Sequence, residues 1–186
     1  MKKKLAVISA VALLCFATLV TLAFFSAQKT TTNVISTGTV DLELYETDGQ
    51  KEYWGENGMT ITGVMPDTDV TKNVFIYNKG SADLYTRVRA TVTVTGADGK
   101  TLSPQYVSYA PNSKDWTEQN GWYYYNSTMK PGDKNSAALF ISSVHIDKNM
   151  PNEYQGCTIR VKVEAQAVQS KNNGSSALNA AGWPAE

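Results

Sequence analysis

Cysteine and histidine are almost absent from this sequence, and their scarcity excludes several classes of protein. Two cysteines, Cys15 and Cys157, are too few for a disulfide-stapled miniprotein or a cysteine-rich zinc site. His145 is the only histidine, so the two histidines of an H-E-x-x-H zinc protease are missing. With 17 Lys and Arg against 17 Asp and Glu, no basic excess points to nucleic acid. What remains is a chain of 186 residues, 42% of them hydrophobic and 10% aromatic, which is too many for wholesale disorder and suits one folded domain.

The first 25 residues have the layout of a secretory signal. Met1-Lys2-Lys3-Lys4 is basic, and the 21 residues from Leu5 to Phe25 carry no charge. Secretory signals combine such a start with an apolar segment and small residues at the cleavage site. Thr21-Leu22-Ala23 supplies the small residues. We therefore predict a signal peptide over residues 1–23; the alternative is an uncleaved membrane anchor, since 21 apolar residues can span a bilayer.

The predicted cleavage falls between Ala23 and Phe24, with Ala27 as the less favoured site. Cleavage removes three lysines, so 14 basic residues face 17 acidic ones and the mature chain has a net charge of −3. It also removes Cys15, which follows Leu14 in the apolar segment and is interpreted as a small apolar side chain rather than a lipidation site. The mature chain then holds one cysteine and no internal disulfide.

The rest of the chain is predicted to form strands joined by turns. Residues alternate between apolar and polar with the period of a half-buried strand. The predicted strands lie at residues 40–45, 60–64, 70–77, 84–94, 121–126, 137–144 and 157–167. Asp98-Gly99 after the fourth strand predicts a hairpin with a type I′ turn.

These strands predict an all-β fold. Five prolines lie between the strands, and no stretch of 11 mature residues shows a helical apolar period. Seven to nine strands at this spacing favour an antiparallel β-sandwich of jelly-roll or immunoglobulin-like type, and we assign it to residues 39–170. Residues 171–186 are polar at first and are predicted to form a flexible C-terminal tail.

Catalytic and metal-binding patterns are weak. The segment Ser142 to Asp147, which includes His145, contains the three residue types of a Ser-His-Asp catalytic triad. A triad is recognised by its geometry, however, and a solvated loop histidine is the preferred interpretation. Asp67 and Asp69 lie on a predicted turn; calcium prefers six to eight oxygens, so an ordinary polar turn is preferred to a metal site. We predict no catalytic residue, no cofactor and no metal.

Cys157 and an aromatic cluster are the other candidates. Cys157 falls on the apolar face of its strand, which predicts a core position. The aromatic residues have two interpretations: they bind sugars or a neighbouring subunit, or they serve the fold, with Trp122 and Tyr124 facing inward. The candidate interaction residues are Trp116, Trp122, Tyr123 and Tyr125.

Several short motifs, in a specific order, resemble the TasA/camelysin family of exported proteins. Thr21-Leu22-Ala23-Phe24-Phe25 is similar to the family's Thr-Leu-Ala-Tyr-Phe junction, and Gly38-Thr39-Val40-Asp41-Leu42 to its Gly-Thr-Leu-Asp-Leu start. Residues 66–72 resemble the turn Pro-Gly-Asp-x-Val-Thr-Lys, with Asp67 in place of Gly. Further matches lie at residues 78–85, at Pro131-Gly132 before Leu139-Phe140, and at residues 164–169.

The resemblance implies a jelly-roll sandwich that is exported through cleavage by a SipW-type signal peptidase. It implies a structural protein of the cell surface or biofilm matrix that associates with itself or with other matrix proteins. In fibre-forming members the mature N-terminal segment is lent as a strand to the next subunit. Residues 24–38 suit this role, being nearly uncharged and free of proline. The candidate donor residues are Phe25, Thr31, Val34, Ile35 and Thr37.

Three alternatives stay open. The N-terminal segment folds back as the protein's own first strand or is a disordered lead-in. Camelysin-like members are classed as metallopeptidases, although this sequence has no zinc motif. A monomeric surface-binding module that uses the tryptophan and tyrosine cluster is the third. Contact with the membrane is expected only transiently, through the signal.

Overall fold

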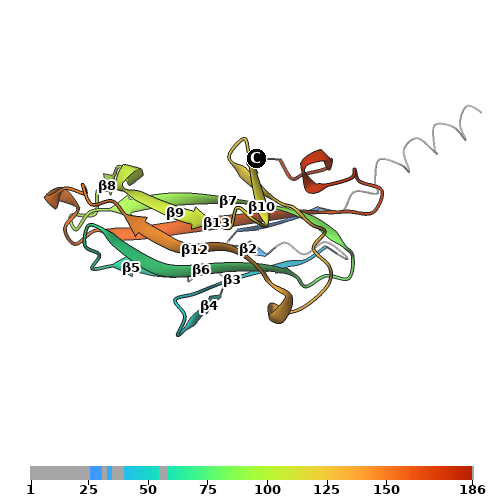
Figure 1. The fold of residues 1–186 in the computed structure, drawn as a ribbon, viewed down its shortest axis with the longest axis horizontal. Helices are drawn as coiled ribbons and strands as arrows, with labels where there is room; N and C mark the ends of the chain where they lie inside the picture. Colours follow the sequence, from blue (N-terminus) through green and yellow to red (C-terminus); the bar gives the residue numbers. More distant parts are fainter. Residues whose placement is uncertain (1–25, 31–32, 35–39, 55–57, 186) are drawn as a thin grey trace, which may run out of the picture.

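The protein is built from two antiparallel β-sheets. The computed structural model describes residues 26–30, 33–34, 40–54 and 58–185, and in this part of the chain it contains strands and short 3-10 helices but no α-helix. The two sheets lie as layers, with β7 and β13 in one and β3, β6 and β12 in the other (Figure 1). The predicted all-β antiparallel fold is confirmed. The predicted signal peptide and the Ala23–Phe24 junction lie outside the described residues.

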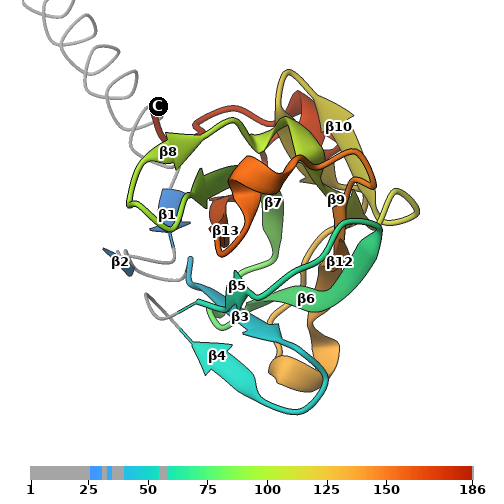
Figure 2. The same ribbon diagram turned by 90° about the vertical axis from the view of Figure 1, so that its left-hand side faces the viewer.

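The larger sheet has eight strands. Its main path runs through β10 (Trp116–Gln119), β11 (Trp122–Tyr125), β7 (Leu84–Thr95), β13 (Thr158–Gln169), β1 (Ser26–Thr30) and β2 (Asn33–Val34). Two short strands join it from the side: β5 (Thr60–Thr62) pairs with β13, and β8 (Thr101–Leu102) pairs with β7. β1 and β2 lie on one side of the molecule and β10 on the other (Figure 2).

The smaller sheet has five strands. Their order is β4 (Glu52–Trp54), β3 (Leu42–Thr47), β6 (Thr68–Asn78), β12 (Ala138–Ile146) and β9 (Val107–Pro111). The 3-10 helices are η1 (Pro104–Tyr106), η2 (Lys134–Ser136), η3 (Asn152–Tyr154) and η4 (Ala177–Asn179). Among the described residues, no helix has the length and apolarity that crossing a membrane requires.

The core lies between the two sheets and is made by the alternation seen in the sequence. Val74 and Ile76 of β6 and Val163 and Ala165 of β13 belong to one buried cluster, and all four residues are fully enclosed. The strands predicted from apolar alternation are all present. β4, β9 and β10 are additional, because they are short strands at the edges or among aromatic residues, where the apolar period is weak.

The hairpin predicted at Asp98-Gly99 is present, but its predicted turn type is wrong. β7 and β8 pair antiparallel, and the N–H of Gly99 donates to the carbonyl of Gly96. Only Gly99 of these turn residues after Gly96 has a positive φ, of 81°, whereas a type I′ turn needs positive φ at both central residues. The connection is a type I turn closed by a left-handed glycine, as in three-residue hairpin loops.

The C-terminal residues pack against the outer face of the larger sheet instead of forming the predicted flexible tail. Asn173 is buried, its amide donates to the carbonyls of Gln169 and Ala181, and its oxygen accepts from the N–H of Ala181. Ala177 is also buried, in a small cluster with Tyr85 and Val168. The polar residues 171–176 therefore belong to a folded loop, in which the side chain of Asn173 makes hydrogen bonds to the backbone that would otherwise be made by other backbone groups.

Candidate functional site

Strand β13 occupies the position on which the donor-strand hypothesis depends. One of its edges pairs with β7 over its whole length, from Thr158 to Gln169. Its other edge is shared by two short partners. β5 covers residues 158–160, and β1 covers residues 164–168. The N-terminal segment thus supplies the strand that completes half of this edge.

The pairing between β1 and β13 has a defined register. Ser26 stands opposite Val168, Ala27 opposite Ala167, and Thr30 opposite Glu164. The chain then turns back, so that Val34 of β2 stands opposite Lys29. In this structure the N-terminal segment therefore pairs with the protein's own β13. The other candidate donor residues, Phe25, Thr31, Ile35 and Thr37, lie outside the described residues.

The β13 residues opposite β1 are buried on both faces. Ala165 and Ala167 face the core and are fully enclosed. On the other face, Gln166 accepts a hydrogen bond from Arg87 and Val168 packs with Ala177 of the C-terminal segment, and both are also fully enclosed. A strand at this position therefore joins a covered part of the sheet rather than an exposed rim. Withdrawal of β1 leaves a row of backbone donors and acceptors without partners, and such an edge readily accepts another strand.

The inward and outward faces of the aromatic cluster are reversed relative to the prediction. Tyr123 and Tyr125 face the core, where their rings contact Phe140 at 5.2 Å and Trp116 at 5.0 Å between centroids. Trp116 is 2% exposed and donates from Nε1 to the carbonyl of Leu139. The prediction that Trp122 and Tyr124 face inward is wrong. Alternation separates two faces but does not identify the inner one when both carry aromatic rings.

Trp122 is buried on the outer face by two arginines. The guanidinium carbons of Arg87 and Arg89 lie 4.2 and 4.5 Å from its ring centroid. Both arginines are held in place, because Arg87 donates from Nε and Nη2 to Gln166 Oε1 and Arg89 pairs with Glu164 at 2.9 Å. Trp122 is only 3% exposed, so its position favours the structural interpretation of this cluster.

Trp183 attaches the C-terminal segment to this arrangement. Arg87 lies between two rings, with its guanidinium carbon 4.8 Å from the Trp183 centroid, and Trp183 meets Tyr124 edge-on at 5.9 Å. We expect Trp183→Ala to lower the free energy of unfolding by about 1–2 kcal/mol, since both the cation–π contact and apolar packing are lost. Urea denaturation measures the change.

Leu178→Ala is the matched control in the same segment. Leu178 is 39% exposed, so its truncation is expected to change stability by less than about 0.5 kcal/mol. Equal effects of the two substitutions would mean that the segment does not depend on the Arg87 contact.

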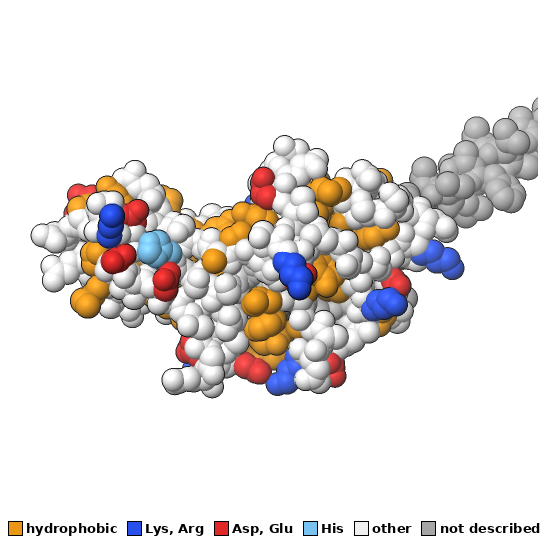
Figure 3. Space-filling model, viewed as in Figure 1, with side chains coloured by type: hydrophobic (Ala, Val, Ile, Leu, Met, Phe, Trp, Pro, Cys, Tyr) orange, Lys and Arg blue, Asp and Glu red, His pale blue; other side chains and the backbone are white. Residues whose placement is uncertain are grey.

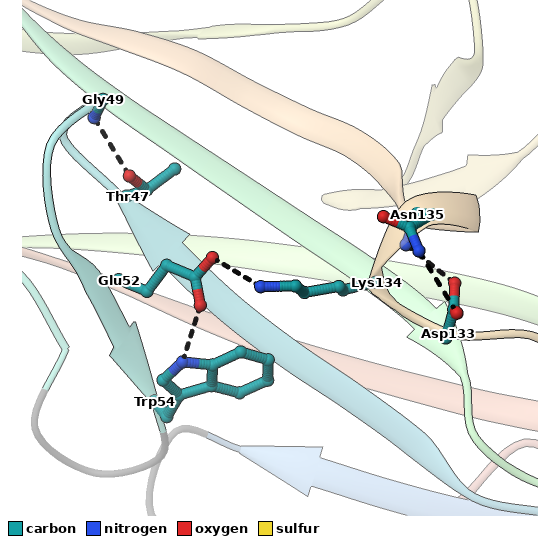
Figure 4. Close-up of polar contacts among 7 residues, drawn as sticks. All are labelled: Thr47, Gly49, Glu52, Trp54, Asp133, Lys134 and Asn135. Atoms are coloured by element: carbon teal, nitrogen blue, oxygen red, sulfur yellow. Dashed lines mark hydrogen bonds and ion pairs between the residues drawn. The ribbon is translucent and has the colours of Figure 1, made fainter.

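A second aromatic group lies on the outer face of the smaller sheet. Trp54, Tyr45 and Phe75 are cross-strand neighbours, and their rings stack at centroid distances of 4.8 and 5.1 Å. Trp54 is 40% exposed, and its Nε1 donates to Glu52, whose other oxygen accepts from Lys134 at 3.1 Å (Figure 4). These contacts tie the β3–β4 hairpin to η2, and the sequence prediction missed this surface because its rings come from three separate strands.

His145 lies on strand β12, so the predicted loop position is wrong. It is seen at one end of the molecule beside acidic side chains (Figure 3), and its Nδ1 lies 3.0 Å from Asp69 Oδ1. Asp147 instead accepts from the backbone and side chain of Asn149. Among the described residues, no group of three or more His, Cys, Asp and Glu side chains is placed to hold a metal ion.

Asp67 has a backbone conformation that favours glycine. Its φ is 60°, in the left-handed region, and its N–H donates to the carbonyl of Ile146. We expect Asp67→Gly to raise the free energy of unfolding by roughly 0.5–1 kcal/mol, since relief of the left-handed strain exceeds the entropy that glycine adds to the unfolded chain. Asp69→Gly, two residues later in β6, is the control and is expected to lower stability by a similar amount. Thermal denaturation of both variants checks the opposite signs.

Cys157 is buried, as predicted. It is 2% exposed and precedes β13, and burial raises the pKa of its thiol. A protonated, enclosed thiol is a poor nucleophile, so this residue contributes packing rather than chemistry.

A buried ion pair, which the sequence prediction missed, lies inside the core. Lys72 of β6 contacts Glu46 of β3, and their side chains are 0% and 2% exposed. The sequence does contain a signal for this pair. Lys72 is two and four residues from Val74 and Ile76, and Glu46 is two residues from Leu44, so strand alternation places both charged side chains on the inward face. A charged residue at an inward strand position indicates a paired or functional group.

No family model, no curated protein and no solved structure matches this chain.

Proposed function

We propose that this protein is an exported structural protein of the cell surface or biofilm matrix, and that it assembles by lending residues 24–38 as a strand to the next copy. The observation that carries the proposal is the pairing of β1 with residues 164–168 of β13. A strand that completes a sheet in one chain has the hydrogen-bonding groups and the register to complete the same sheet in another.

The acceptor position supports an exchange of this kind. β1 connects to the rest of the domain through residues 31–39, and its main pairing is with a single strand, β13. Exchange therefore replaces one set of backbone hydrogen bonds by an identical set in a neighbour. Since the bonds lost and gained are the same, the balance between monomer and polymer depends on concentration rather than on new contacts.

Export and fold type complete the proposal. The basic start and apolar segment of residues 1–23 support a secretory signal cleaved after Ala23 by a SipW-type peptidase. The order of motifs supports membership of the TasA/camelysin family, and with it a jelly-roll type of sandwich. The left-handed backbone of Asp67 is consistent with the glycine that the family has at that place in its turn.

Light scattering tests the proposal directly. The mature chain, starting at Phe24, is expected to scatter more strongly over hours at high concentration, whereas a chain starting at Gly38 stays at its initial value because it has no strand to lend. Fibres formed by the shorter chain would contradict donor-strand exchange. A mature chain that stays monomeric would favour the alternative of a monomeric surface-binding module.

The enzyme alternative needs a separate assay. A camelysin-like metallopeptidase would cleave a protein substrate, and a chelator would stop the cleavage. We expect no chelator-sensitive cleavage by the purified protein.

A further inference from the structure

The ion pair between Glu46 and Lys72 has unusual surroundings. Both residues point into the apolar space between the sheets, in the same cluster region as Leu44, Val74 and Ile76. Removing a carboxylate and an ammonium group from water is energetically unfavourable, and the attraction between them often fails to offset that cost. Burial lowers the pKa of Lys72, which favours the neutral amine. The amine form of Lys72, which is the form that reacts with a carboxyl group, is therefore favoured by its surroundings.

The two carboxylate oxygens of Glu46 differ. Oε2 contacts Lys72 Nζ and accepts from the N–H of Met59 at 2.6 Å. Oε1 is buried, and no described residue donates a hydrogen bond to it. A buried acceptor without a partner destabilises the fold, so the site has one oxygen held by hydrogen bonds and one whose departure removes a destabilising group.

We propose that Glu46 and Lys72 become joined by an amide bond between their side chains, which links β3 to β6. In this condensation the ammonium group of Lys72 gives up two protons, and its nitrogen bonds to the carboxyl carbon of Glu46. The bond from that carbon to Oε1 breaks, and Oε1 leaves with the two protons as water. No oxidant or reductant is needed, because the step only exchanges a carbon–oxygen bond for a carbon–nitrogen bond.

The geometry supplies what such a condensation requires. Amines and carboxylic acids react slowly in water, but groups held in contact behave as if at effective concentrations of about 10⁵ M or more. The N–H of Met59 is placed to stabilise the charge that develops on Oε2 as the nitrogen adds. Exclusion of water from the core favours the amide, since hydrolysis needs a water molecule at the same carbon.

The proposed amide would stabilise the fold in the way that a disulfide does in exported proteins. Cys157 is the only cysteine among the described residues, and it is free. An amide between residues 46 and 72 closes a loop in the unfolded chain, as a disulfide does, and in the chain-entropy model such a cross-link stabilises the fold by lowering the entropy of the unfolded state. The inference is independent of the proposed polymerisation, because it concerns a bond within one chain.

Mass spectrometry of the purified, unaltered protein decides the question. Trypsin cleaves after Lys51 and Lys79 but not after an acylated Lys72, so a denatured digest is expected to contain residues 30–51 joined to residues 52–79 as its main product. The mass of this species is lower than the sum of the two peptides by one water molecule. Fragmentation should place the link at Glu46 and Lys72.

Lys72→Arg is the control, since arginine retains the charge but is not expected to form the amide, and its digest should give residues 30–51, 52–72 and 73–79 separately. The same three peptides as the main products from the unaltered protein, even with a minor linked species, would overturn the proposal. The result does not depend on how well the control variant folds, because the decisive measurement is made on the natural chain.

Discussion

Lys72→Met is expected to lower the free energy of unfolding by about 3–5 kcal/mol, the largest effect we anticipate for a single substitution. The Glu46 side chain then stays in the core, 2% exposed, without its cationic partner. Breaking a buried pair from one side costs this much because a desolvated charge loses its compensation. Any covalent link between the two side chains would be lost as well, which acts in the same direction. Urea denaturation followed by tryptophan fluorescence measures the change.

Lys79→Met provides a matched control. Lys79 follows the same strand and pairs with Glu43 at 3.2 Å, but its side chain is 57% exposed. Exposed ion pairs contribute at most about 1 kcal/mol, so this variant should remain close to the parent protein. Similar losses in both variants would contradict the interpretation that burial, rather than pairing, sets the cost.

A double substitution, Ala27→Cys with Ala167→Cys, is expected to turn assembled protein into a ladder of covalently linked chains. The two alanines stand opposite each other in the β1–β13 pairing, and directly opposed residues of antiparallel strands are close enough for a disulfide. The variant is assembled under reducing conditions and oxidised afterwards, so that the bonds record the pairing already present. Non-reducing electrophoresis separates linked from unlinked chains.

The same variant oxidised before assembly supplies the control. In the monomer β1 pairs with β13 of its own chain, so oxidation should give a single band with the mobility of one chain. Ala27→Cys alone should give no ladder, because one accessible cysteine per chain, with Cys157 buried, can link at most two chains. Assembled material that runs as single chains after oxidation would show that the N-terminal strand stays with its own domain, and the exchange mechanism would then be wrong.

Strand positions could be predicted from the sequence where one face meets the core and the other meets solvent. Val92 and Val94 of β7 alternate with exposed threonines, and Val161 of β13 with exposed Arg160 and Lys162. The alternation disappears in the other halves of these strands. There Tyr85 and Arg87 are buried on the outer face, because the C-terminal segment covers them.

The remaining errors share one physical cause, which is that contacts between distant segments decide which surface is covered. Trp122 lies on the outer face, yet it is buried by arginines from β7 that strand alternation assigns to solvent. Trp183 orders the C-terminal segment through Arg87, far away in the sequence. The Glu46–Lys72 pair, by contrast, could have been predicted from strand alternation alone, since each of these charged residues occupies an inward-facing position among apolar residues of its strand.

The position of β13 also determines the order in which the domain can form during synthesis. β1 is made well before its partner, residues 164–168, because more than 130 residues separate them in the sequence. The pairings of β5 and β7 with β13 likewise form only after β13 has been made. Pairings over such long sequence separations form slowly. Throughout that interval the N-terminal strand is without its own partner. In the proposed exchange, a neighbouring chain whose β13 edge is free competes for this strand, so a high local concentration of unfolded chains would favour exchange over closure.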